Sequence, residues 1–364
     1  MKIVFDSQIF GLQRVGGISR YIVELASELA TLQNVFPRIV APLHSNQLLW
    51  RSSAPRFDCF LKRSVMPAGL RQRLDRSISE CAIQALRPEV LHRSYYLTNR
   101  RPKGVKALIV TVHDMIHELF AAAYPPEERT SVMKRKAVRA ADHVICVSEN
   151  TRKDLCGLFD VPPEKVSVVY HGVRAFDGKP GDIPIERPFL LFVGHRWEYK
   201  NFSGLLKAVA SNSRLRGEFA IVAFGGRAFD PDERRSMREL GFADGDVIRT
   251  TGGDDVLLGL YRRAEAFVYP SRYEGFGLPL LEAMAAGCPV VSSHAACLPE
   301  VGGEAAEYFD PVQPDDLAGA IENVVFSRER RERLRRLGFE RASEFTWRRT
   351  AEKTLEVYKR CLGH

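Results

Sequence analysis

Short apolar runs alternate with amphipathic segments along the whole chain, and this alternation constrains the fold more than any other feature. The runs that predict strands in the first half are 2–5, 38–41, 90–92, 107–112, 143–147 and 166–170. Those in the second half are 189–193, 220–224, 247–250, 266–269, 290–292 and 307–309. Between them lie helical patterns, such as the stripe of Ile18, Ile22, Leu25 and Leu29. Strands that alternate with helices predict an α/β protein with doubly wound parallel sheets.

The plan of the first half is repeated in the second half. A length of 364 residues suits two domains. Residues 175–188 are rich in proline and glycine and predict a linker between a domain at 1–174 and one at 189–345. Each half opens with a strand that runs towards glycine, at Gly16 and Gly17 in the first and at Gly194 in the second. We therefore expect two Rossmann-like domains that face a central cleft at the carboxyl ends of their strands.

Composition narrows the class of protein. The apolar fraction of 45% and the charged fraction of 27% are those of a globular protein. No apolar stretch is long enough to span a membrane, and the start lacks the features of a signal peptide, so we expect a cytoplasmic protein. Seven scattered cysteines without a C-x-x-C pair argue against a disulfide framework or a zinc site.

Positive charge is concentrated in the first half of the chain. Residues 1–172 carry 25 Lys and Arg against 16 Asp and Glu, whereas residues 173–364 carry 28 against 29. Such asymmetry suits an anionic partner, such as a membrane surface, a lipid-linked phosphate or nucleic acid, or reflects a generally basic proteome. The arginine-dense segment 327–362 has no aromatic stacking platform, so we expect a solvated helix face and no nucleic-acid partner.

Residues 67–80 have the pattern of a basic amphipathic helix. Leu70, Leu74 and Ile78 form an apolar stripe, and the arginines opposite to it are Arg71, Arg73 and Arg76. Such a helix can make peripheral contact with the anionic inner face of the cell membrane. It can equally cover a domain with its stripe in the core, and the sequence favours this second interpretation.

The strongest chemical signal lies at residues 269–291. A strand at 266–269 leads into a turn with Glu274 and Gly277, and a helix is expected at 278–286. Glycines before a helix let backbone N–H groups approach an anion, which the helix dipole also favours. Glu274 and Glu282 could accept hydrogen bonds from vicinal hydroxyls of a sugar nucleotide. A capped surface helix with two solvated glutamates explains the pattern equally well.

Three further motifs follow predicted strands. Arg196 and Lys200, after Gly194, could neutralise a diphosphate, or form an exposed basic loop. The Gly16–Gly17 pair could cradle phosphate or form a plain turn. His113 and Asp114 end the buried-looking strand 107–112, where a histidine is more often structural than functional.

These motifs together resemble those of glycosyltransferase family four, whose retaining members have the two-Rossmann B fold (GT-B). Glu274-x7-Glu282 within Glu-Gly-Phe-Gly-Leu-Pro resembles the E-x7-E signature, and residues 194–201 resemble the donor loop G-x-R-x-x-Y-K-N. The resemblance implies that Glu274 contacts the transferred sugar and Glu282 the ribose. It places the backbone of Phe276, Gly277 and Leu278 against sugar and diphosphate.

The resemblance extends to the first domain and to the end of the chain. Gly16 and Gly17 resemble the family's G-G-[IA] phosphate loop, and His113-Asp114 resembles its H-D pair, in which the histidine contacts the donor sugar. His171 departs from the pattern, because the family commonly has asparagine there. Residues 346–364 resemble the last helix of the family, which returns to the first, acceptor-side domain, while the second domain binds the nucleotide sugar.

The resemblance implies a metal-independent hexosyltransferase that needs no cofactor. Its expected catalytic residues are His113, Asp114 and Glu274, and Arg196 and Lys200 would replace a metal ion in stabilising the diphosphate. The favoured donor is GDP-mannose, followed by a UDP-sugar, and the acceptor would be a saccharide or lipid-linked saccharide of lipopolysaccharide or other cell-surface polysaccharide synthesis. A UDP-sugar epimerase on the same scaffold and a non-catalytic nucleotide-sugar-binding protein are the alternatives.

Overall fold

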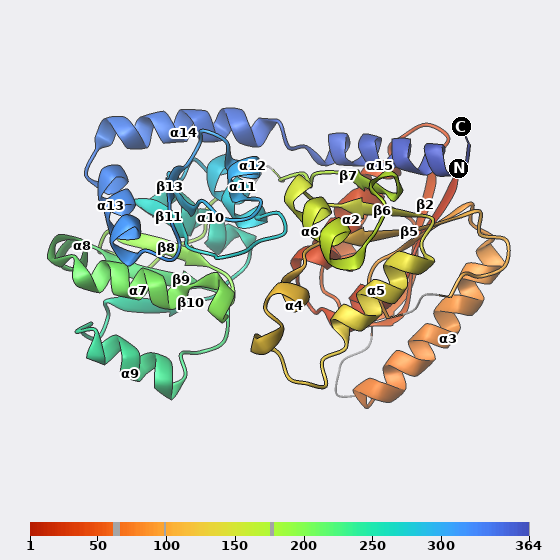
Figure 1. Ribbon diagram of the computed structural model, residues 1–364, viewed down its shortest axis with the longest axis horizontal. Helices are drawn as coiled ribbons and strands as arrows, with labels where there is room; N and C mark the ends of the chain where they lie inside the picture. The colour runs from red at the N-terminus through yellow and green to blue at the C-terminus, as the bar shows by residue number, and fades with distance from the viewer. Residues whose placement is uncertain (61–65, 98–99, 175–177, 364) are drawn as a thin grey trace. The chain divides into compact units, whose positions relative to one another are not determined.

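Two structural units divide the chain (Figure 1). The computed structural model describes residues 1–60, 66–97, 100–174 and 178–363. Unit 1 comprises Met1–Gly172 and Thr346–His364, and unit 2 comprises Val173–Phe345. The chain therefore leaves unit 1 once and returns to it with its last helix, α15 (Trp347–Cys361).

Within the described residues, unit 1 is built on a parallel sheet of seven strands in the order β3-β2-β1-β4-β5-β6-β7. The strands are β1 (Lys2–Phe5), β2 (Phe36–His44), β3 (Arg56–Phe60), β4 (Val90–Arg93), β5 (Ala107–Val112), β6 (His143–Cys146) and β7 (Val166–Val168). The order reverses direction at β1, which is the arrangement of a doubly wound sheet.

Different helices cover the two faces of this sheet. Ile3 and Phe5 of β1 pack with buried side chains of α2 (Gly17–Leu29) and of α15. Val4 points to the opposite face and packs with Ile83 of α3 (Ala68–Leu86), as expected from the alternation of side chains along a strand. The other helices are α1 (Gln8–Leu12), α4 (Ile116–Leu119), α5 (Thr130–Ala140) and α6 (Glu149–Phe159), with the 3-10 helices η1 (Leu49–Arg51), η3 (Ala121–Ala123) and η4 (Pro163–Lys165).

Unit 2 repeats this plan with six parallel strands among its described residues, in the order β10-β9-β8-β11-β12-β13. The strands are β8 (Phe189–Val193), β9 (Ala220–Phe224), β10 (Val247–Thr250), β11 (Ala266–Tyr269), β12 (Val290–Ser293) and β13 (Glu307–Phe309). The helices are α7 (Phe202–Ser211), α8 (Ser213–Glu218), α9 (Pro231–Glu239), α10 (Asp254–Arg263), α11 (Leu278–Ala285), α12 (Leu298–Gly302), α13 (Pro314–Val325) and α14 (Arg328–Ser343), with the 3-10 helix η5 (Glu198–Lys200).

The predicted α/β class with two doubly wound parallel sheets is confirmed. Every predicted strand is present, although β2 is longer than the expected run 38–41. Strand β3, at the edge of the unit 1 sheet, has no clear apolar pattern in the sequence, because Arg56 and Asp58 interrupt it and Phe57 is half exposed. The arginine-dense segment 327–362, expected to be helical, contains two helices, α14 and α15, and α15 begins at Trp347, close to the start of the last helix expected at 346–364.

The segment predicted as a linker packs onto unit 2. Its described part, residues 178–188, forms neither helix nor strand, and residues 175–177 lie outside the described part of the chain. Ile183 and Ile185 are buried. The guanidinium of Arg263 in α10 donates to the carbonyl oxygens of both residues at 2.5 Å. The proline- and glycine-rich segment 178–188 is therefore attached to unit 2, although it forms no regular secondary structure.

The apolar stripe of α3 is exposed, so the favoured prediction that it lies in the core is wrong. Leu70, Leu74 and Ile78 are 51%, 39% and 39% exposed. The helix instead turns a polar stripe inward, where Asp75 accepts hydrogen bonds from the Ser7 hydroxyl and from a main-chain N–H of β2. These hydrogen bonds to Asp75 fix the rotation of the helix. Among the described residues, no helix combines the length and the apolar character needed to cross a bilayer.

Candidate active site

Glycine-rich turns follow three neighbouring strands at the carboxyl edge of the unit 2 sheet. Gly194 follows β8, Gly225 and Gly226 follow β9, and residues 251–253 follow β10. The φ angles of Gly194, Gly225 and Gly226 are 125°, 90° and 63°, in the left-handed region that favours glycine. The turns are joined, because Gly194 N donates to the last carbonyl of β9 and Gly225 N to that of β10. The main chain here can therefore approach an anionic ligand closely.

A buried ion pair lies at the same edge. Nζ of Lys200, at the end of η5, is 2.5 Å from Oε1 of Glu274, in the turn after β11. Nζ also lies 5.4 Å from the ring centre of Tyr269. Burial, followed by the negative charge of Glu274, raises the pKa of Tyr269 well above its ordinary value. The Cys297 thiol donates to the carbonyl oxygen of Glu274 at 3.1 Å, which helps to fix this turn.

Helix α11 begins at Leu278, directly after this turn. Gly277 precedes it with a φ of 90°, and a Cβ on Gly277 would lie 2.9 Å from Cδ2 of Leu298. Only glycine fits this position without strain. Phe276 is buried, and Glu282 lies about one turn inside the helix and is half-buried. The helix therefore starts at the carboxyl edge of the sheet, where its dipole favours an anion.

Arg196 is held differently from Lys200. Its Nε and Nη2 donate to the Glu233 carboxylate at 2.7 and 3.2 Å, and its guanidinium lies 4.5 Å from the ring centre of Phe229. The remaining nitrogen, Nη1, is buried without a hydrogen-bond partner and would be 2.9 Å from a Cβ on Gly226. Glu233 thus binds two of the three guanidinium nitrogens of Arg196 that were expected to bind a diphosphate. Nη1, beside the glycine turn, is the nitrogen that remains available to a ligand.

Two Asp-x-Asp pairs occur in unit 2, a spacing that can hold a divalent ion. Asp230 of the first pair caps α9, where its side chain accepts from the N–H groups of Asp232 and Glu233. Asp246 of the second pair accepts from Nη1 of Arg187 at 2.6 Å and from a main-chain N–H at 2.8 Å. These carboxylates therefore stabilise the fold of unit 2.

In unit 1, His113 follows β5 and lies among aromatic rings. Its ring centre is 5.2 Å from that of Tyr21 and 5.7 Å from that of His171, on which it stacks. The Tyr21 hydroxyl is hydrogen-bonded to Thr111 at 3.2 Å. Burial lowers the pKa of His113 to about 4 and that of His171 well below its ordinary value. Both imidazoles are therefore neutral at pH 7. A pKa of about 4 makes His113 a weak base, so it suits a hydrogen bond to a sugar hydroxyl better than proton abstraction.

Asp114 shapes the turn that follows β5. Its Oδ1 accepts from the N–H of Ile116 at 3.1 Å, where α4 begins. Nζ of Lys134 donates to the main-chain carbonyl of Asp114 at 2.9 Å and lies 3.8 Å from its Oδ1. Through these contacts Asp114 fixes the conformation of the turn that carries His113.

The glycine pair at the start of α2 is partly covered by a side chain. Oε1 of Gln13 accepts from the N–H of Ser19 in the first turn of α2 at 3.1 Å, and a Cβ on Gly16 would meet this oxygen at 2.4 Å. Gly17 is exposed and has open space in its Cβ direction. A phosphate at this helix start would therefore compete with the Gln13 side chain.

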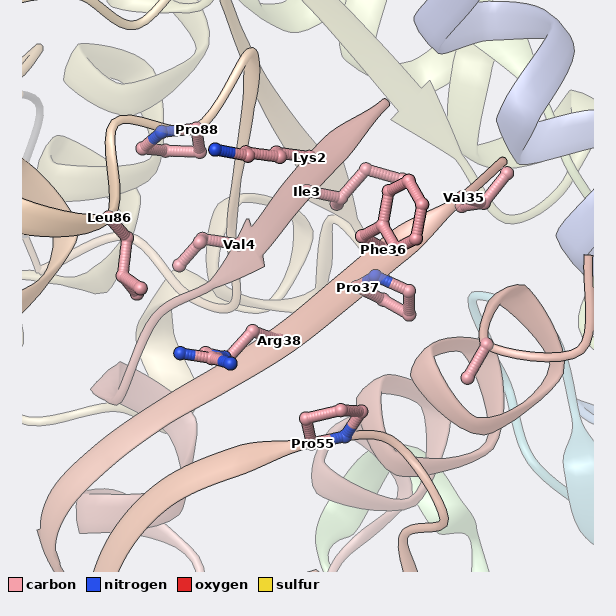
Figure 2. A pocket seen from close by; sticks show the side chains of 11 residues that line it. Lys2, Ile3, Val4, Val35, Phe36, Pro37, Arg38, Pro55, Leu86 and Pro88 are labelled. Carbon is pink, nitrogen blue, oxygen red and sulfur yellow. The ribbon is translucent and has the colours of Figure 1, made fainter. Parts of the chain in front are cut away.

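A cavity of about 440 Å³ lies at the opposite edge of the unit 1 sheet. Figure 2 shows Lys2 and Val4 of β1 beside Phe36 and Arg38 of β2, which are the first residues of these strands. Ligands in doubly wound folds bind at the carboxyl ends of the strands, not at this amino edge. The cavity is therefore separate from the site that contains His113.

Comparison with known proteins identifies the family. The model of "Glycosyltransferase Family 4" matches residues 15–175, and that of "Glycosyl transferases group 1" matches residues 174–341. The D-inositol 3-phosphate glycosyltransferase of Saccharomonospora viridis is 30% identical over 305 residues, which cover 76% of this chain and 70% of that protein. The chain belongs to glycosyltransferase family 4. The predicted family is thus confirmed, and with it the activity class of a glycosyltransferase.

Two further relatives match the glycosyltransferase over nearly its whole length. The O-antigen chain mannosyltransferase B of Escherichia coli is 27% identical over 388 residues, with coverage of 99% of this chain and all of that protein. The solved sucrose-phosphate synthase of Thermosynechococcus elongatus aligns with a TM-score of 0.77 at 19% identity, over 99% of both chains. This structural match confirms the GT-B fold.

Lys134, which belongs to none of the predicted motifs, organises the turn after β5 in the glycosyltransferase. Its side chain is only 1% exposed, and its Nζ contacts Glu118 at 2.8 Å as well as Asp114. A signal was present in the sequence, because Lys134 falls on the same helical stripe as the buried Thr130, Ala137 and Val138. A lysine in a buried stripe indicates a specific anionic partner.

Proposed function

We propose that the glycosyltransferase transfers a hexose, with mannose favoured, from a nucleotide diphosphate sugar to a saccharide or lipid-linked saccharide, with retention of configuration. The observation that carries the proposal is the Lys200–Glu274 pair at the start of α11. It joins a cation suited to a phosphate and a carboxylate suited to sugar hydroxyls at one helix N-terminus.

The donor that we favour is GDP-mannose, with a UDP-sugar as the second candidate. The support is the mannosyltransferase named among the relatives, which matches 99% of the chain. Glu274 would hold the hexose and Glu282 the ribose, while the backbone at Phe276, Gly277 and Leu278 would lie along the diphosphate. In unit 1, Gly16 and Gly17 would contribute amides to the phosphate, and His113 would contact the sugar.

The chemistry that we propose needs neither metal nor cofactor. As the bond from the anomeric carbon to the diphosphate oxygen breaks, negative charge builds on the phosphate. Lys200, Nη1 of Arg196 and the amides at the start of α11 would stabilise that charge. The acceptor hydroxyl would form the new bond on the face that the diphosphate leaves, and its proton would pass to the leaving phosphate. Asp114 would act only by positioning the turn beside His113.

We further propose that the protein acts in the cytoplasm, at the inner face of the cell membrane, in lipopolysaccharide or other cell-surface polysaccharide synthesis. The support is the exposed stripe of α3, together with the excess of positive charge in residues 1–172. A helix that exposes an apolar stripe and also exposes Arg73 and Arg76 suits an anionic lipid surface.

The decisive experiment supplies the protein with GDP-mannose, UDP-glucose and UDP-galactose in separate reactions, each with and without methyl α-mannoside or α-1,3-mannobiose. Products are analysed by NMR for anomeric configuration and linkage. We expect an α-linked mannoside that forms only when acceptor is present. An inverted product would overturn the proposed retention, and an isomerised UDP-sugar without acceptor would establish an epimerase. Binding of nucleotide sugar without turnover would indicate a non-catalytic protein.

A further inference from the structure

A second cavity in unit 1 lies beside the turn that follows β5. Its volume is about 780 Å³, enough for one or two sugar rings. The lining residues belong to α4, to the segment that leads into α5, to α5 itself and to the end of α6. Figure 1 shows where these three helices lie in unit 1. Since α4 begins two residues after Asp114, the cavity adjoins the carboxyl edge of the sheet that carries His113.

Two residues that line this cavity each have a side-chain polar atom that is buried without a hydrogen-bond partner. These atoms are Nδ1 of His117 and Oε1 of Glu118. The Glu118 side chain is only 6% exposed, and its other oxygen is held by Nζ of Lys134 at 2.8 Å. Buried polar groups in native proteins are nearly always hydrogen-bonded. These two atoms therefore indicate a ligand that brings its own hydroxyl groups.

The rest of the wall combines flat apolar surface with polar groups. The rings of His117 and Tyr124 stack with centres 4.3 Å apart, and Pro125 and Pro126 continue this surface. Flat rings and prolines suit the C–H faces of a pyranose. Hydrogen-bonding groups beside such a surface are what a saccharide requires.

The protonation states in the cavity also suit a neutral polyhydroxyl ligand. Hydrogen bonds from Thr130 lower the pKa of Glu128, which is therefore an acceptor of hydroxyl protons at pH 7. Burial raises the pKa of Tyr124 to about 12, so its hydroxyl remains a donor. The guanidinium of Arg135 also lines the cavity, and its charge opposes that of the Glu128 carboxylate. Lys134 is neutralised by Glu118, so these charges balance and suit an uncharged ligand.

We propose that this cavity is a subsite for an uncharged saccharide, the acceptor of the transfer proposed above, on which the inference rests. Oε1 of Glu118 and Nδ1 of His117 bind hydroxyl groups of the saccharide, and Tyr124 packs against its ring. The cavity at the amino edge of the sheet suits the same ligand less well, because the polar side chains among its lining residues are those of Lys2 and Arg38, and neither can accept a hydrogen bond from a hydroxyl group.

The test is ligand-observed NMR with methyl α-mannoside and α-1,3-mannobiose in the absence of nucleotide. It is applied to the wild type, to Tyr124→Ala and Glu118→Gln, and to the control Phe36→Ala, which removes an exposed aromatic ring from the other cavity. We expect the wild type and the control to bind α-1,3-mannobiose with equal affinity. Tyr124→Ala and Glu118→Gln should each weaken binding at least fivefold. If Glu118→Gln fails to fold, Tyr124→Ala alone decides.

A transfer assay separates this inference from the proposed function. We expect Tyr124→Ala to raise the acceptor KM at least fivefold, with less than a twofold change in kcat and in GDP affinity. Transfer with an unchanged acceptor KM would overturn the subsite and leave the proposed function standing. Absence of transfer with every donor would overturn the proposed function, while the NMR titration would still decide the subsite. Failure of both saccharides to bind, or tighter binding of mannose 6-phosphate, would also overturn the inference.

Discussion

The ammonium group of Lys200 lies 2.5 Å from the Glu274 carboxylate, and the two side chains are only 14% and 9% exposed. A buried ion pair differs from a surface salt bridge, because each charge has lost its hydrating water and is stabilised mainly by the opposite charge. Removal of one partner from a buried pair typically destabilises a protein by about 3–5 kcal/mol. The pair therefore contributes to the folded state of unit 2 as well as to the proposed site, and an experiment has to separate the two contributions.

Variants of the pair provide that separation. Lys200→Met should lower the free energy of unfolding by about 3 kcal/mol, because Glu274 is left buried and unpaired. The double variant Lys200→Met with Glu274→Gln should regain most of that stability, since no unpaired charge remains. Its transfer activity should stay at least about 100-fold below wild type, as for the loss of a main electrostatic contact to a transition state. Urea unfolding and a transfer assay measure the two effects.

The control for these variants is Arg328→Gln on α14, which removes a pair with Glu332 that is largely exposed. It should leave the free energy of unfolding close to that of the wild type, because an exposed ion pair contributes little to stability. Recovery of transfer in the double variant would show that the pair only stabilises the fold.

Gly277 offers a test of the turn that precedes α11. Gly277→Ala should destabilise the protein by about 1–3 kcal/mol, because its φ of 90° disfavours a side chain and the new Cβ would contact Leu298. The matched control is Gly319→Ala inside α13, where a Cβ meets open space. It should stabilise the protein by about 0.5–1 kcal/mol. Thermal unfolding measures both, and equal midpoints for the two variants would contradict the turn geometry.

The sequence predicted what depends on local pattern and missed what depends on the rotation of a helix. The strand that leads to Glu274 and the glycine at the start of α11 follow from apolar runs and turn residues, and both are present. The apolar stripe of α3 predicts a helix face in the core, but hydrogen bonds of Asp75 to distant segments rotate the stripe outward. A single sequence does not reveal such partners before the fold brings them together.

The same limit applied to side chains whose importance comes from burial. Lys134 gains its role from Glu118 and from the carbonyl of Asp114, which are 16 and 20 residues away in the chain. The partner that Arg196 binds, Glu233, is 37 residues away and was not considered. Motif spacing predicted Arg196 and Lys200 as cations of the candidate site, but it gave no information on whether either already has an anionic partner.

Buried neutral histidines predict a loss of stability in mild acid. Burial holds the pKa of His171 well below the value near 6.5 of an unfolded chain. Below pH 6.5 the unfolded chain binds a proton that the folded chain does not, so this histidine lowers stability as the pH falls from 6.5. The free energy of unfolding should fall between pH 7 and pH 5 in the wild type, and in His171→Asn this fall should be smaller by about 2 kcal/mol.

Urea unfolding of wild type and His171→Asn at pH 7.0, 6.0 and 5.0 measures this difference. His294→Asn, at an exposed position in unit 2, is the control and should follow the wild-type curve. Parallel pH curves for wild type and His171→Asn would show that His171 is protonated in the folded protein.

The exposed stripe of α3 predicts binding to anionic lipid. Three apolar side chains on one helix face, with Arg73 and Arg76 exposed on the same helix, can insert at the boundary between headgroups and acyl chains. The triple variant Leu70→Gln, Leu74→Gln and Ile78→Gln should reduce co-sedimentation with phosphatidylglycerol vesicles at least tenfold, because burial of each side chain contributes about 1.5–3 kcal/mol when complete. Wild-type binding should also weaken in high salt, since salt screens the charge of the arginines.

The control is Val312→Gln, at a position 69% exposed in unit 2, which should bind the vesicles as the wild type does. Equal sedimentation of the triple variant and wild type would mean that α3 does not contact lipid.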